Sequence, residues 1–136
     1  MYLNCHSYYS LRYGMMSVEQ LVQNAIAAGE ECIAMTDINN STGIPEFAGE
    51  CEKNRIKPIA GIEFRNDNEL QYIGIARNNS GLRELNGFLS ELNFNGASIP
   101  FPAPAFSEAY TIYSLNKVPA EISSYLSIQV LFQNIV

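Results

Sequence analysis

Residues 32–37 read Cys-Ile-Ala-Met-Thr-Asp, and this short stretch indicates the class of fold. Four consecutive apolar residues have the length of a strand. An apolar run without alternation is typical of a strand that is buried on both faces in a parallel sheet. The polar pair Thr36-Asp37 ends the run and places Asp37 at the carboxyl end of the strand. Ligands gather at such ends in α/β proteins, so Asp37 is a candidate functional residue.

Helical patterns lie on both sides of this strand. Upstream, Ser17-Val18-Glu19-Gln20 has the S-x-x-Q form of a capping box, and Gly29 supplies a stop, which predicts a helix between them. The other predicted elements are an extended start over residues 1–5, helices over 45–53 and 80–92, and strands over 56–64 and 70–76. This order predicts an α/β fold with parallel strands.

The 136 residues, 47% of them hydrophobic, are enough for one packed domain and too few for two. Residues 1–93 are expected to form a β/α core. Residues 94–109 change to a Pro- and Gly-rich connection, and residues 110–136 are expected to add a further strand, a short helix and a divergent tail.

Composition excludes several classes of function. The formal net charge of −6 disfavours a domain that binds DNA by itself, because such domains present a basic face to the phosphates. Three widely spaced cysteines without a C-x-x-C pair indicate reduced thiols, and no apolar run reaches the roughly 20 residues of a membrane span. A cytoplasmic protein without membrane contact is therefore expected.

One constellation could carry chemistry. His6, Asp37 and Glu63 each fall at the expected carboxyl end of a separate strand, and their nitrogen and oxygen atoms are suitable ligands for Zn, Mn or Fe. The alternative is that each is an ordinary polar strand end, with Asp37 capping a turn and His6 hydrogen-bonded to the backbone. Spacing alone leaves both interpretations open.

Four segments, in this order, resemble motifs of the PHP (polymerase and histidinol phosphatase) domain of bacterial DNA polymerase III alpha subunits. They read CHSYYSLRYGMMSVEQLV (residues 5–22), AMTDINNSTGIPEF (34–47), RIKPIAGIEF (55–64) and YIGIARNNSGLRELNGFLSE (72–91). The likeness spans about residues 1–92. It implies a distorted (β/α)7 barrel, of which this chain supplies a truncated, partial version.

The resemblance also implies a degenerate metal site. Of the family's ligand positions, His6, Asp37 and Glu63 are retained. The positions that match a family histidine but carry another residue are Tyr2, Asn4, Ile38 and Gln71. Loss of that many imidazoles should abolish tight metal binding, so no cofactor is expected.

The function that the resemblance implies is that of a non-catalytic structural and interaction module of a replicative polymerase. Its implied partners are the remaining polymerase domains and a proofreading exonuclease. DNA contact and nucleotidyl transfer would belong to the full polymerase. The alternative is a metal-dependent phosphoesterase or 3′–5′ exonuclease that uses Zn or Mn at a reduced site. A partial barrel leaves sheet edges uncovered, so the isolated chain is expected to dimerise or swap elements.

Overall fold

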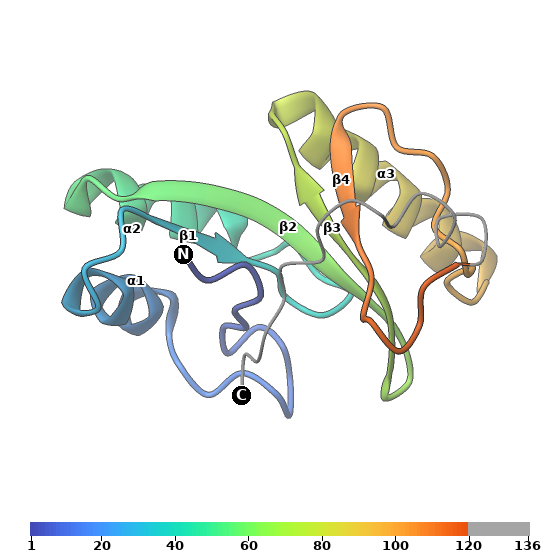
Figure 1. Cartoon of the computed structure of the whole chain (residues 1–136), viewed down its shortest axis with the longest axis horizontal. Helices are drawn as coiled ribbons and strands as arrows, with labels where there is room; N and C mark the ends of the chain where they lie inside the picture. The colour runs from blue at the N-terminus through green and yellow to red at the C-terminus, as the bar shows by residue number, and fades with distance from the viewer. Residues whose placement is uncertain (120–136) are drawn as a thin grey trace.

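The computed structural model describes residues 1–119, which form one mixed sheet with helices packed against it (Figure 1). The predicted short helix and the divergent tail lie largely outside these residues. In chain order the elements are α1 (Val18–Ala27), β1 (Cys32–Met35), α2 (Ile44–Asn54), β2 (Lys57–Asn66), β3 (Glu69–Ala76), α3 (Asn79–Asn95) and β4 (Ala109–Ile112). No helix within the described residues combines the length and apolar composition needed to cross a membrane.

The strand order is β1-β2-β3-β4, with β1 and β2 parallel but β3 and β4 antiparallel to their neighbours. The prediction of parallel strands is therefore confirmed for the first pair and wrong for the other two. Only Asp67 and Asn68 join β2 to β3, and Asp67 adopts a left-handed conformation with φ of 50°. A connection this short closes an antiparallel hairpin, whereas a parallel pair needs a long crossover. The result is an open mixed α/β sheet, consistent with a partial barrel.

Helix α1 begins where the capping box predicts. The Ser17 hydroxyl accepts from the Gln20 backbone N–H at 3.1 Å, and the Gln20 side chain accepts from the Ser17 N–H at 3.0 Å. At the other end Gly29 has φ of 73°, a left-handed conformation that glycine adopts without strain. The predicted start and stop of this helix are both confirmed.

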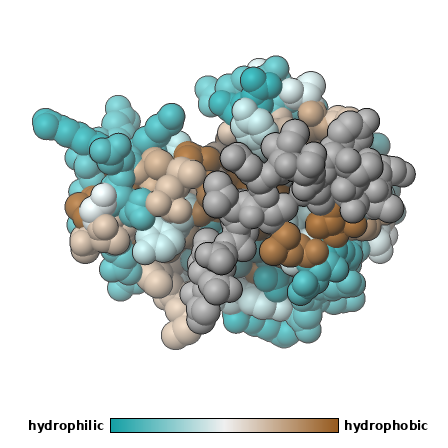
Figure 2. All heavy atoms as spheres, in the orientation of Figure 1, coloured by the Kyte–Doolittle hydropathy of each residue, from teal (hydrophilic) through white to brown (hydrophobic). Residues whose placement is uncertain are grey.

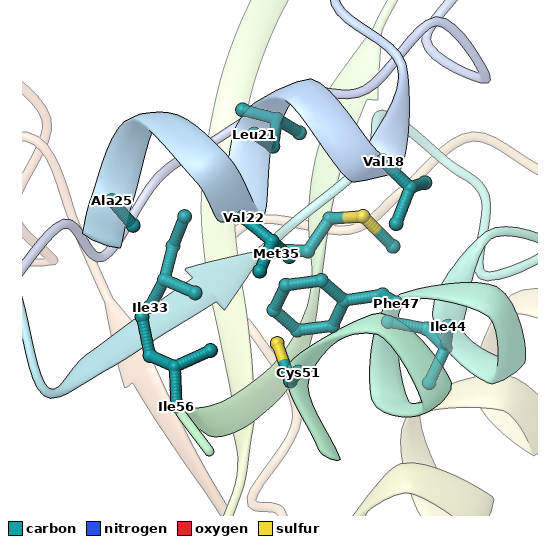
Figure 3. Close-up of a cluster of buried hydrophobic side chains, with 10 residues drawn as sticks. All are labelled: Val18, Leu21, Val22, Ala25, Ile33, Met35, Ile44, Phe47, Cys51 and Ile56. Atoms are coloured by element: carbon teal, nitrogen blue, oxygen red, sulfur yellow. The ribbon is translucent and has the colours of Figure 1, made fainter. Parts of the chain in front are cut away.

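The helices cover one face of the sheet through two apolar clusters. In the first cluster the Phe47 ring projects from α2 toward the side chains of β1 and α1 (Figure 3). In the second, Leu85 and Leu89 of α3 pack on Ile62 and Phe64 of β2. Side chains alternate between the two faces of a strand, so Glu63 lies on the face of β2 that the helices do not cover.

Tyr72 offers a simple check of this core. Its side chain is fully buried, and its hydroxyl has no hydrogen-bond partner in the described part of the chain. We expect Tyr72→Phe to raise the free energy of unfolding by about 1 kcal/mol in urea titrations, because a buried, unpaired hydroxyl is removed. Tyr113→Phe is the matched control, since the Tyr113 hydroxyl accepts from the Ala103 N–H at 3.0 Å, and it should lower stability. If Tyr72→Phe lost as much stability as Tyr113→Phe, the Tyr72 hydroxyl would have to be hydrogen-bonded, which would contradict this structure.

Candidate functional site

The segment before the first helix and the ends of β1 and β2 meet on the uncovered face of the sheet. The chain from Tyr2 onward runs beside β1: the Ala34 N–H donates to the Tyr2 carbonyl at 2.9 Å. Beyond β1, the Glu63 N–H donates to the Asp37 carbonyl at 3.1 Å. This pairing brings the backbones that carry His6, Asp37 and Glu63 to neighbouring positions. The predicted extended start forms only an isolated bridge at Tyr2, and β2 continues beyond Glu63 to Asn66.

Glu63 is the centre of a buried polar network. Its side chain is 0% exposed, and its Oε2 accepts from Asn4 Nδ2 and is hydrogen-bonded to His6 Nε2, both at 2.9 Å. Its Oε1 accepts from Arg65 Nε. The Thr36 hydroxyl donates to the Asn4 Oδ1 at 2.6 Å, which orients the Asn4 amide so that its N–H₂ faces Glu63.

These partners keep the Glu63 carboxyl ionised. Burial alone would raise its pKa, because it disfavours the charged form. Hydrogen bonds from His6 and Asn4, the charge of His6 and the hydrogen bond from Arg65 act in the opposite direction and hold the pKa below its ordinary value. An ionised Glu63 only accepts hydrogen bonds, which suits the amide donor of Asn4 and the guanidinium donor of Arg65.

Asp37 has a separate set of partners. Its Oδ1 accepts from the Ser7 N–H at 2.7 Å and from the Ser10 hydroxyl at 2.6 Å, and its Oδ2 accepts from the Ser7 hydroxyl at 2.7 Å. The Ser10 oxygen in turn accepts from the Ile38 N–H at 2.9 Å. Asp37 is thus a buried anchor for the loop after His6, close to the interpretation of a turn cap. His6 differs from that interpretation, because its partner is a side chain.

The positions that match lost family ligands have diverse surroundings. Asn4 remains beside Glu63, whereas Tyr2 is 42% exposed. Ile38 forms a parallel bridge with Glu63 through the backbone. Gln71 is buried on β3, where it donates to the Glu69 carbonyl at 3.1 Å and accepts from Lys117 Nζ at 2.9 Å.

The donor set does not fit a divalent metal ion. No group of three His, Cys, Asp or Glu side chains within residues 1–119 is arranged to hold one. His6 and Glu63 are engaged with each other, and both Asp37 oxygens accept from serine groups. A catalytic Zn site takes three protein ligands and leaves one position open to water, which these side chains do not provide.

Arg65, Ser7 and Ser10 are the site residues that sequence reasoning missed. One signal could have found Arg65: it follows Glu63 by two positions in a strand, and such residues share a face. No sequence signal singled out Ser7 and Ser10, which donate to the Asp37 carboxylate. The cleft of about 360 Å³ between α2 and the start of α3 is a different feature, and no acid, His or Cys lines it.

The model of the PHP domain family matches residues 3–127. DNA polymerase III subunit alpha of Staphylococcus aureus is 35% identical over 97 residues, which cover 69% of this chain and 9% of that subunit. The same subunit of Ureaplasma parvum is 32% identical over 83 residues, or 61% of this chain and 8% of the relative. The chain therefore spans less than a tenth of the length of these relatives.

Two solved structures share the fold. A candidate metal-dependent phosphoesterase from Bifidobacterium adolescentis aligns with a TM-score of 0.53 at 16% identity, over 68% of this chain and 33% of its own. An amidohydrolase from Chromobacterium violaceum aligns with a TM-score of 0.54 at 20% identity, over 69% of this chain and 33% of its own. With the family match over residues 3–127 and 35% identity to the staphylococcal subunit, the chain belongs to the PHP domain family.

Proposed function

We propose that the chain is the PHP unit of a bacterial replicative DNA polymerase III alpha subunit, and that it acts as a structural and interaction module without hydrolytic activity. The similarity to two polymerase subunits supports the first part. The second part rests on one observation: both retained carboxylates, Asp37 and Glu63, are already satisfied by donors from the chain itself.

Metal-dependent hydrolysis of a phosphoester places specific demands on such a site. The ion must be held by several ligands and must keep an open position at which it activates water. The His6 Nε2 is hydrogen-bonded to Glu63, and Arg65 already supplies Glu63 with a positive charge. Metal binding would require these bonds to break, which opposes the alternative of a phosphoesterase or exonuclease with Zn or Mn.

An interaction role agrees with the surface of the chain. Apolar side chains reach the surface among hydrophilic ones on the face shown in Figure 2. Large hydrophobic side chains are exposed throughout the first sixteen residues: Met1, Tyr2, Tyr8, Leu11, Tyr13, Met15 and Met16. Exposed apolar groups in such number favour contact with another protein surface. The proposed partners are the other polymerase domains and a proofreading exonuclease.

Two further parts of the proposal concern DNA and location. A net charge of −6 supports DNA contact through other polymerase domains instead of through this unit. The free thiols of Cys5, Cys32 and Cys51 support a reducing, cytoplasmic setting. Dimerisation of the isolated chain stays a prediction.

Calorimetric titration of the demetallated chain with Zn²⁺ and then Mn²⁺ tests the absence of hydrolytic function. We expect only weak, non-stoichiometric association and no Mn²⁺-stimulated hydrolysis of bis-p-nitrophenyl phosphate, because no open ligand set is present. His6→Ala is the control: it removes the imidazole of the retained ligand set. Stoichiometric, micromolar binding that disappears in His6→Ala would favour the hydrolase alternative.

A further inference from the structure

The geometry points to Arg65 as the resident cation of this site: its guanidinium supplies the positive charge that a bound divalent ion would supply to Glu63. The site would then be complete without metal. This inference deepens the proposed function and rests on it, because a site that held a metal ion would need no second cation.

The strand positions the two charges together. Glu63 and Arg65 are two residues apart on β2 and therefore share the face that the helices leave uncovered. The pairing of β2 with β3 shifts register between Phe64 and Arg65. The residue left unpaired by this shift is Gln71 of β3, so β2 keeps its regular alternation through Glu63 and Arg65. Arg65 Nε donates to the Glu63 oxygen that neither Asn4 nor His6 contacts.

Within residues 1–119, Arg65 alone brings a permanent charge to this carboxylate. Asn4 is neutral, and His6 is cationic only when protonated, whereas a guanidinium is protonated at every accessible pH. The Glu63 side chain is 0% exposed and that of Arg65 16% exposed, so water screens the pair little. Removing one partner of a buried ion pair leaves an uncompensated charge, which is strongly destabilising.

The surrounding side chains hold Arg65 in place. Its backbone N–H donates to Asn39 Oδ1 at 2.9 Å, and Asn39 Nδ2 donates to the Arg65 carbonyl at 2.8 Å. Its guanidinium lies 4.6 Å from the centroid of the Tyr13 ring, and the Tyr13 hydroxyl donates to Asn68 Oδ1 at 2.6 Å. Arg65 thus connects the loop before α1, the loop after β1 and the β2–β3 hairpin, as a metal ion connects separate loops.

Arg65→Met tests the inference, because methionine keeps much of the side-chain length without the charge. We expect the equilibrium constant for unfolding in urea to rise at least about 100-fold, or folding to be lost. Arg77→Met is the matched control: the Arg77 guanidinium lies 5.5 Å from the Tyr110 ring centroid, which gives a cation–π contact without a carboxylate partner in the described chain. Arg77→Met should change the equilibrium constant for unfolding by no more than about fivefold.

The double variant Glu63→Gln with Arg65→Met separates charge from packing. A neutral amide at position 63 needs no counter-ion. We therefore expect the equilibrium constant for unfolding of the double variant to be at least about tenfold lower than that of Arg65→Met. If Arg65→Met does not fold, the double variant should restore folding. Equal effects of Arg65→Met and Arg77→Met, or no recovery in the double variant, would overturn the role of Arg65. A native chain that loses stability in EDTA would instead overturn the absence of metal and with it the proposed function.

Discussion

Gly14→Ala is expected to lower the free energy of unfolding by about 3 kcal/mol or more, which is a large fraction of a small domain's stability. A Cβ atom at residue 14 would lie 1.7 Å from the Ser7 carbonyl oxygen and 2.4 Å from its carbon. Ser7 cannot easily retreat, since its N–H and hydroxyl both donate to Asp37 and its carbonyl accepts from the Ser10 N–H at 2.9 Å. The added methyl group must therefore disrupt the loop that Asp37 anchors.

Gly87→Ala is the matched control for this substitution. Gly87 lies within α3, and a Cβ there would meet no atom within 4 Å. Alanine has the higher helix propensity, so Gly87→Ala should raise stability by about 1 kcal/mol. Urea unfolding of both variants, followed by circular dichroism, gives the comparison. If Gly14→Ala were as stable as the native chain, the close packing of the loop against Ser7 would be disproved.

Local signals explain why much of the fold could be predicted. The capping box at Ser17 and the apolar run before Asp37 depend on neighbours in sequence, and they located α1 and β1. The direction of β3 was wrong because the α/β pattern was extended across a connection of only two residues, Asp67 and Asn68. The predicted strands left residues 65–69 between them, and even that length is too short for a parallel crossover and should have decided for a hairpin.

The candidate site was predictable only in part, for a physical reason. Strand ends indicate which residues lie near one another, and they correctly grouped His6 with Glu63. They do not indicate which donor reaches which carboxylate oxygen. A shared face of β2 places Arg65 near Glu63, but the carboxylate oxygen that it reaches depends on tertiary packing, and the contact of Asp37 with Ser7 depends on a loop conformation.

Asp37→Ala is expected to lower the free energy of unfolding by about 4 kcal/mol. It removes the acceptor of three hydrogen bonds and leaves the Ser7 N–H and the hydroxyls of Ser7 and Ser10 without their partner inside the protein. Hydrogen bonds to a charged group contribute about 1.5–3 kcal/mol each, and buried donors that lose a partner add a desolvation cost. Asp37→Asn is the conservative control and should lose less, because one carboxamide oxygen still accepts.

Measuring the stability lost in Asp37→Ala with and without metal distinguishes a loop anchor from a metal ligand. An anchor for the serine loop is needed whether or not divalent ions are present, so the loss in Asp37→Ala should be the same in EDTA and in Mn²⁺. Combining Asp37→Ala with Ser10→Ala should cost less than the sum of the single variants, since both remove the same bond. A metal ligand behaves differently: its substitution costs stability only when the ion is bound. Asp37 would be assigned to a metal site if Asp37→Ala lost stability only in Mn²⁺ and if its effect added fully to that of Ser10→Ala. That result would remove the main support for a non-catalytic unit.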